Sequence, residues 1–283
     1  MAIAMTGKFP RTRRVGQRFS GSTDSFGEQA VFYWTALRWS WRAVTHYKKE
    51  TLRLIAEISM GSGALAVIGG TVVIVGFLTL ASGATIAVQG YSSLGNIGVE
   101  ALTGFFAAFI NVRIASPVIA GIGLAATIGA GSTAQLGAMR ISEEIDALEV
   151  MGIPSMPYLV TTRVVAGLIA IIPLYSLAVI MSFLASRFAT VVIYGQSGGV
   201  YDHYFTTFLI PTDILWSFLQ AILMAVVIML IHTYYGYTAS GGPAGVGEAV
   251  GNAVRASLIA VVVVTLLVSL AIYGGTGNFN LSG

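Results

Sequence analysis

The chain gathers four of its twelve acidic residues within seven positions, at Glu143, Glu144, Asp146 and Glu149. They lie in the stretch MRISEEIDALEVMGIP, residues 139–154, where they alternate with the apolar side chains of Ile145, Leu148 and Met151. A short helix of this kind can fill a groove with its apolar stripe while its carboxylates bind surrounding cations. The pattern therefore predicts an element that docks on another protein. The alternative is a solvated loop whose acids only favour a helix N-terminus.

Arg113 is the other residue whose position suggests chemistry, because it interrupts an apolar region. An arginine inside a membrane helix costs at least a few kcal/mol unless it is paired or hydrated. Glu100 and Asp213 are the candidate partners.

Residues for covalent catalysis or metal binding are scarce in this sequence. Cysteine is absent, and the three histidines have no metal-ligand spacing. The Gly-rich stretch GAGST is not followed by the Lys-Ser or Lys-Thr of a phosphate-binding loop. We therefore predict a chain that is not an enzyme, with no metal site and no bound cofactor of its own.

The composition is that of an integral membrane protein: 55% of the 283 residues are hydrophobic, and 10% are charged. The mean hydropathy is +0.81. Five runs contain no Asp, Glu, Lys or Arg and exceed the roughly 20 residues that a helix needs to cross a bilayer, namely residues 61–99, 114–139, 164–186, 214–247 and 256–283. We predict an all-α fold with five transmembrane helices, the first over about 62–88, and a short or re-entrant piece over 97–112 before the second.

The distribution of cations predicts the orientation. Ten of the fifteen Lys and Arg precede residue 60. A cytoplasmic N-terminus places those ten on the same side as Arg140, Arg163 and Arg255, which fits the positive-inside rule. The acidic stretch is then cytoplasmic as well, and the C-terminus is outside. We expect a multi-pass protein of the plasma (inner) membrane.

The segment before the first span predicts an amphipathic helix that lies along the membrane interface. We assign residues 1–29 to a flexible basic segment, 30–58 to the interfacial helix and 59–283 to the transmembrane domain, with a docking helix near 141–152. The segment clusters Trp34, Trp39 and Trp41 beside cations, as expected at lipid headgroups. Such aromatics favour a membrane over nucleic acid as the partner. A solvated helix docked on the rest of the protein is the alternative.

Small residues recur every fourth position in the second span and predict close helix packing. One face carries Gly121, Ala125 and Gly129, and the other carries Gly123, Thr127 and Gly131. We expect these faces to pack against neighbouring helices, including those of a second subunit.

Two resemblances give the acidic stretch a family context. The sequence DALEVMG, Asp146 to Gly152, resembles the coupling-helix pattern with which import-type ABC permeases contact their ATPase. The longer SEEIDALEVMGI resembles the signature of MlaE/YrbE permeases, the membrane subunits of ABC lipid transporters that work with MCE proteins. QGY at 89–91, LGAMR at 136–140 and GPAGVGEAVGNAV in the approach to the last span resemble the same family. The likeness extends over about residues 50–275 and is greatest for the B-type YrbE subunits of actinobacteria.

The resemblance implies a function and a set of partners. It implies a permease that moves a fatty acid, mycolic acid, sterol or related lipid across the cell envelope, powered by ATP and Mg bound to a partner ATPase. The implied partners are an A-type YrbE permease in a heterodimer, the cytoplasmic ABC ATPase, periplasmic MCE proteins and membrane lipids. The implied site residues are Glu143, Glu144, Asp146, Leu148, Glu149 and Gly152 for ATPase coupling, and Arg113, Gln89 and Tyr91 for the substrate path.

The chain departs from the family pattern at three polar positions. Ile114 and Gln135 stand where the family has Glu, and Thr127 stands where it has Arg. These changes remove polar partners of a symmetric homodimer and favour a heterodimer.

Two other function classes remain open from the residues. An ion-coupled secondary lipid transporter needs midplane carboxylates and usually an internal repeat, and the charge-free runs contain neither. A membrane-embedded lipid-modifying enzyme needs a cluster of bases or nucleophiles, which the scattered histidines do not supply.

Overall fold

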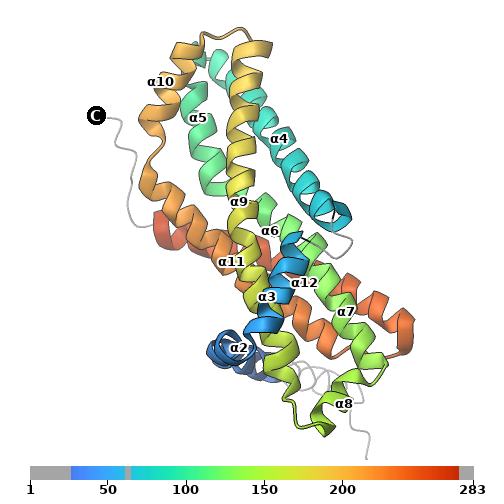
Figure 1. Cartoon of the computed structure of the whole chain (residues 1–283). Coiled ribbons are helices and arrows are strands. Elements are labelled where there is room, and N and C mark those ends of the chain that lie inside the picture. The colour runs from blue at the N-terminus through green and yellow to red at the C-terminus, as the bar shows by residue number, and fades with distance from the viewer. Residues whose placement is uncertain (1–26, 61–64, 274–283) are drawn as a thin grey trace, which may run out of the picture.

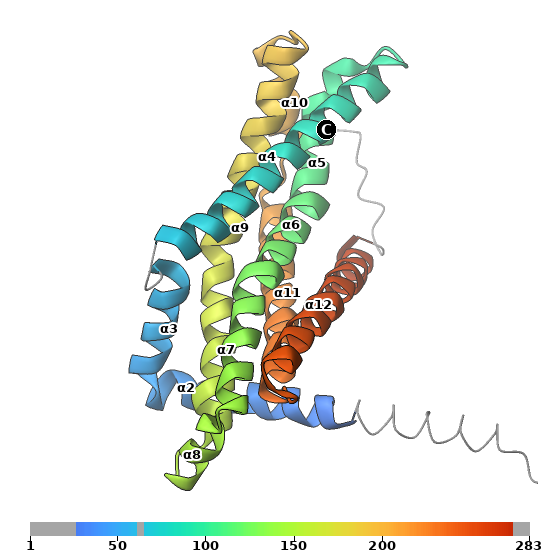
Figure 2. The same cartoon turned by 90° about the vertical axis from the view of Figure 1, so that its right-hand side faces the viewer.

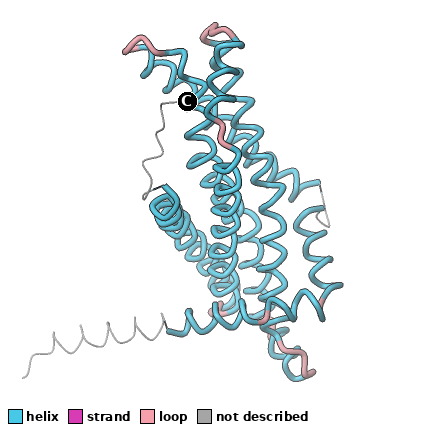
Figure 3. Tube along the Cα trace, turned by 90° about the vertical axis from the view of Figure 1, so that its left-hand side faces the viewer, coloured by secondary structure: helices cyan, strands magenta, loops and turns pink. Residues whose placement is uncertain are grey.

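Five long apolar helical stretches form the body of the protein. In the computed structural model, which describes residues 27–60 and 65–273, every regular element is helical (Figure 3). Five apolar stretches are long enough to cross a membrane, namely Gly70–Gly95, Glu100–Ile141, Met156–Ile193, Pro211–Tyr237 and Gly242–Ile272. The all-α fold and the five spans are thus confirmed.

The first span is α4 (Leu65–Gly95), and it lies along the third span, whose main part is α9 (Thr162–Phe188) (Figure 1). The second span joins α5 (Thr103–Ile110), α6 (Ser116–Leu124) and α7 (Ala130–Ile141) through π-helical turns. The fourth span is α11 (Pro211–Tyr237), and the fifth is α12 (Gly242–Tyr273).

The two ends of the bundle differ. At one end lie the short helix α8 (Glu144–Val150) and a helix over residues 27–38 (Figure 2). We call this the α8 end. The other end carries the turn between α4 and α5 and the helix α10 (Gly198–Phe208), and we call it the α10 end.

The second and third spans are longer than a bilayer requires. They contain 42 and 38 residues, or about 60 Å of helix at 1.5 Å per residue, against a hydrocarbon core of about 30 Å. α11 begins well below the tip of the bundle in Figure 1, so α5, α10 and the last turns of α9 extend past it at the α10 end. In this extension Arg187 binds Asp202 with 2.8 and 2.9 Å hydrogen bonds. The hydrogen bond from Arg187 holds the pKa of the Asp202 carboxyl below its usual value.

The core of the bundle is built from side chains of four spans. Val75 of α4, Leu124 of α6, Ile171 and Tyr175 of α9 and Met224 of α11 are all fully buried. Because lipid is as apolar as these side chains, close packing rather than the hydrophobic effect holds the spans together. α12 is the exception, since only 11% of its apolar window is buried, against 50% for α11.

Three helix boundaries differ from the predictions. α4 continues to Gly95, past the predicted end near residue 88. The segment over 97–112 is no separate piece, because from Glu100 onward it belongs to one continuous helical stretch. The last span begins at Gly242, well before residue 256, and contains Glu248 and Arg255. The physical reason is that the part of a helix outside the hydrocarbon core can carry charges, so a charge-free run marks the hydrocarbon core and not the whole helix.

The predicted single helix over 30–58 is three helices in the structure. A helix over residues 27–38 is followed by α2 (Ser40–His46) and α3 (Lys48–Met60). The first lies crosswise at the α8 end, where Phe32 and Ala36 are buried against α9 and α11, whereas α3 stands beside α9 (Figure 2). One straight helix cannot follow both surfaces. Placement of the segment at a membrane interface stays a prediction, and most of the predicted flexible segment over 1–29 lies outside the described residues.

Candidate functional site

The acidic stretch forms a short helix at the tip of the α8 end. α7 ends at Ile141, and Glu143 takes a left-handed conformation with φ of 60° before α8 begins at Glu144. At the other end of α8, the N–H groups of Gly152 and Ile153 donate to the carbonyls of Glu149 and Leu148 at 2.9 and 3.0 Å. Gly152 has φ of 75°, which glycine adopts readily at this position after a helix. The left-handed residues Glu143 and Gly152 therefore mark the two ends of α8 and limit it to a short helix.

Apolar packing fastens α8 to its own chain. Ile145 is fully buried in a cluster with Leu136 of α7 and Leu159, and Leu148 packs against that cluster. Val150 and Met151 point outward, with exposed fractions of 89% and 65%. The prediction that Ile145, Leu148 and Met151 share one outward stripe is therefore wrong. A helix of seven residues can pack only one of its faces against the rest of the chain, and in α8 Ile145 and Leu148 form that face.

The four carboxylates of the stretch have different environments. Asp146 is exposed and accepts a 2.7 Å hydrogen bond from Arg140, whose side chain is partly buried. Glu144 accepts a 3.0 Å hydrogen bond from Ser142. Glu149 is drawn toward the bundle, because its Oε1 accepts a 2.5 Å bond from Ser155 and a 3.4 Å bond from Tyr237 of α11. Exposed Glu143 and Glu144 thus face outward, and Glu149 connects α8 to α11.

Arg113 has a carboxylate partner in the fourth span. Its Nη2 and Nε lie 2.6 and 3.0 Å from Oδ2 of Asp213, the acid in the first turn of α11. The side chains are only 11% and 17% exposed. The guanidinium also lies 4.2 Å from the ring centroid of Phe109. Of the two candidate partners, Asp213 is the one that the structure brings to Arg113, at the level where α11 begins.

Gln89 and Tyr91, the other predicted substrate-path residues, lie near the end of α4. Gln89 is exposed, with its amide 3.5 Å from Ser93 on the same helix. Tyr91 stacks on Tyr194, with ring centroids 4.4 Å apart. Their role in a substrate path stays a prediction.

An apolar groove of about 550 Å³ lies between α4 and the end of α9. Leu80, Leu184 and Phe188 line it, and Arg187 is its one charged lining residue. The groove lies on the first and third spans, and Arg113 is not among the residues that line it.

The four glycines predicted to pack do not behave alike. A Cβ added to Gly121 would meet Met224 at 3.2 Å, and one on Gly129 would meet the ring of His232 at 2.5 Å. A Cβ on Gly123 would collide with Val75. Gly131 has nothing within 4 Å of that position. Three of the four glycines therefore pack inside the chain, and only Gly131 leaves an open face.

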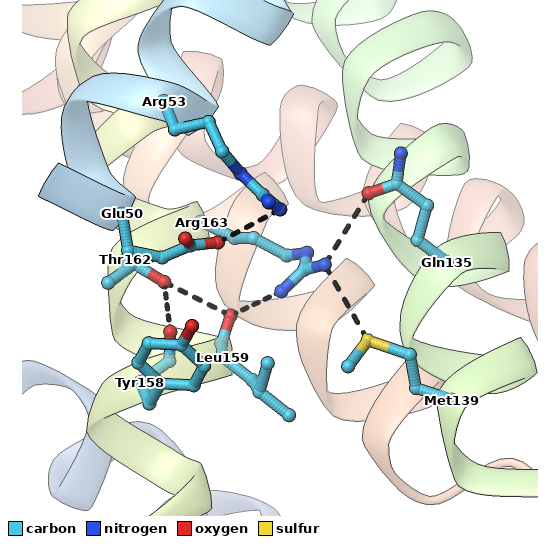
Figure 4. Close-up of polar contacts among 8 residues, drawn as sticks. All are labelled: Glu50, Arg53, Gln135, Met139, Tyr158, Leu159, Thr162 and Arg163. Atoms are coloured by element: carbon cyan, nitrogen blue, oxygen red, sulfur yellow. Dashed lines mark hydrogen bonds and ion pairs between the residues drawn. The ribbon is translucent and has the colours of Figure 1, made fainter. Parts of the chain in front are cut away.

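A buried cation that the sequence analysis treated only as an orientation signal lies in the α8 half of the bundle. Arg163 of α9 is 6% exposed and donates to the Leu159 carbonyl at 2.9 Å (Figure 4). Its Nη2 lies 3.5 Å from Oε1 of Gln135 and 3.9 Å from the sulfur of Met139. Figure 4 shows α3 beside the same cluster, where Arg53 pairs with Glu50 at 3.2 Å. Gln135 itself is exposed on α7, so it links the buried guanidinium to the surface.

A second buried polar contact joins α7 to α11. The Thr133 hydroxyl lies 2.8 Å from Nδ1 of His232, and both side chains are fully buried. Sequence reasoning missed this pair, as it missed the contact between Arg163 and Gln135. The only signal available was a polar residue inside an apolar run, which does not identify its partner.

Comparison with known proteins places these features in context. A family model described as "Permease MlaE" matches residues 60–271. The Arabidopsis thaliana protein TRIGALACTOSYLDIACYLGLYCEROL 1, chloroplastic, is 29% identical over 196 residues, which cover 69% of this chain and 56% of the plant protein. A Rickettsia bellii protein named "Probable ABC transporter permease protein" is 28% identical over 196 residues, covering 69% of this chain and 76% of the relative. A similarly named protein of Synechocystis is 26% identical over 166 residues, covering 59% and 63%.

Proposed function

The chain belongs to the MlaE permease family, and we propose that it is the membrane subunit of an ATP-driven lipid transporter. Membership makes it a permease. The ATPase partner, the lipid cargo and the assembly with MCE proteins are proposals that go beyond family membership.

The observation that carries the ATPase assignment is the way α8 is presented. It lies at the tip of the α8 end, fastened by Ile145, with Glu143 and Glu144 exposed (Figure 1). A rigidly anchored element with outward carboxylates can transmit a movement of its partner to the spans. Between residues 139 and 162 the sequence has four carboxylates and one cation, Arg140. α8 and its flanking loops therefore present negative charge to a partner surface carrying Lys or Arg.

The proposed cargo is an apolar lipid such as a fatty acid, mycolic acid or sterol. The groove between α4 and α9 is apolar apart from Arg187. The ion pair of Arg113 and Asp213 lies beside the start of α11. Two hydrogen bonds join the guanidinium to Asp213, so a lipid headgroup at this position would meet the pair and not Arg113 alone.

We further propose a second, related permease subunit as the neighbour in the membrane, with the α8 end cytoplasmic and MCE proteins outside. The exposed side chains of α12 include Ile259, Leu266 and Leu270. Gly131 opens a small-residue face on α7. Gln135, on the same exposed side of that helix, carries no charge where the family has Glu, which favours an A-type YrbE chain over a second copy of this one.

Charge reversal in α8 tests the ATPase assignment. Glu144→Lys with Asp146→Lys should release the ATPase during purification from the native membrane, because two attractive contacts become repulsive. The five spans do not depend on these exposed side chains, so the amount of inserted protein should be unchanged. Recovery of the ATPase at the wild-type level with the double variant would refute the assignment. A wild-type chain that copurifies with no ATPase would refute the transporter proposal itself.

A further inference from the structure

A second pocket lies behind α8, where three distant parts of the chain meet. It has a volume of about 360 Å³ and is lined by Trp39, Glu149, residues 152–157 and Tyr237. Trp39 comes from the turn after the helix over 27–38, Glu149 from α8 and Tyr237 from the end of α11. The pocket therefore opens beside the proposed docking helix and is not part of the groove between α4 and α9.

The pocket combines aromatic rings with one carboxylate. In the part of the chain that the structure describes, both hydrogen bonds to Glu149 go to Oε1, from Ser155 and Tyr237. A carboxylate has about four lone-pair sites on its two oxygens, so Glu149 retains capacity to accept from another donor. Trp39 and Tyr237 line the same space as Glu149, and an aromatic ring beside a carboxylate favours a bound cation.

Beside the pocket, an aromatic ring and a carboxylate already bind one guanidinium, that of Arg140. Arg140 lies 5.9 Å from the ring centroid of Tyr237, and its Nη1 is 2.7 Å from Asp146. An aromatic ring and a carboxylate thus bind a cation immediately beside the pocket. Glu149 is the one charged residue among those that line the pocket.

We propose that this pocket binds an arginine or lysine side chain of the ATPase, with Glu149 as the charge partner and Trp39 as the aromatic wall. The inference rests on the proposed function and adds a defined socket to it. α8 then contacts the ATPase on two sides, through exposed Glu143 and Glu144 and through the cation held behind the helix. It also gives the crosswise helix over 27–38 a part in docking, because that helix positions Trp39.

Titration of the copurifying ATPase onto the full-length permease complex in lipid nanodiscs tests the socket. Glu149→Gln keeps the acceptor for Ser155 but removes the charge, and it should weaken ATPase binding by about tenfold. Trp39→Ala should weaken it by about fivefold, and Trp39→Phe, which keeps a ring, should restore most of the affinity. Trp41→Ala is the matched control, since Trp41 is 80% exposed two residues away and should leave the affinity unchanged.

A photoreactive amino acid at exposed Pro154, in the lining loop, identifies the occupant. The expected crosslink joins this position to an ATPase peptide that contains Arg or Lys. Crosslinks confined to lipid or to residues 1–26 of this chain would overturn the inference. Equal ATPase affinity of the wild type, Trp39→Ala and Glu149→Gln would overturn it while leaving the ATPase partnership intact. A wild-type complex that captures no ATPase would overturn the proposed function and this inference together.

Discussion

The ion pair of Arg113 and Asp213 allows a sharp test of how charges are accommodated in this bundle. Both side chains are largely buried, and two hydrogen bonds of 2.6 and 3.0 Å join them. Removing one partner of a buried pair costs about 3–5 kcal/mol because the other charge loses its compensation. For Arg113→Leu we expect the lower value, about 3 kcal/mol, since Asp213 stays in the first turn of α11, where the helix dipole favours an anion.

A double variant distinguishes the cost of leaving one charge without its partner from the cost of removing the whole ion pair. Arg113→Leu with Asp213→Leu removes both charges, and replacing a buried ion pair by apolar residues is often neutral. We expect it to cost about 1 kcal/mol or less. At roughly 2–4 °C per kcal/mol for a chain of this size, Arg113→Leu should lower the melting temperature by about 6–12 °C and the double variant by only a few degrees.

Thermal melting of the purified chain in detergent, followed by tryptophan fluorescence, measures these shifts. A double variant that melts as low as Arg113→Leu would refute the reasoning, and so would an Arg113→Leu variant that melts like the wild type. Lipid transport by the double variant then decides the role of Arg113. Loss of transport at restored stability assigns the pair to the lipid path, and normal transport makes it structural.

Three further predictions concern helix packing and assembly. Gly129→Ala should lower the melting temperature, because the added Cβ would meet the His232 ring at 2.5 Å. Gly131→Ala should leave the melting temperature equal or raise it, because alanine favours a helix over glycine by up to about 1 kcal/mol and the added Cβ meets nothing within 4 Å. Equal losses of melting temperature in the two variants would contradict the assigned packing. Gln135→Glu should raise the melting temperature by a few degrees, since a carboxylate replaces the amide 3.5 Å from Arg163, and a lower value would show that burial of the added charge dominates. The native complex should contain one copy of this chain and one related permease by native mass spectrometry; two identical copies would refute the heterodimer and not the permease.

The sequence alone determined the broad architecture because lipid imposes a simple rule. A backbone that crosses a bilayer must satisfy its hydrogen bonds internally, so long charge-free runs become helices, and the five spans follow from composition. The sequence also predicted that the acidic stretch lies outside the spans, since clustered Asp and Glu have no place in the hydrocarbon core, and α8 does lie between the second and third spans. Family signatures in SEEIDALEVMGI added the permease assignment, which the family model bears out.

The tertiary structure decided which residues meet and which face each one occupies. Leu148 and Ile145 pack inward, because α8 needs an anchor on α7 and on Leu159, and periodicity does not say which face of a short helix is used. Arg113 had two candidate acids in the sequence, and only the position of α11 beside the second span selects Asp213. The three-part course of residues 27–60 follows from two packing surfaces that no local pattern encodes. The pocket of Trp39, Glu149 and Tyr237 joins residues more than 80 positions apart, so only the fold could bring an aromatic wall to a carboxylate of α8.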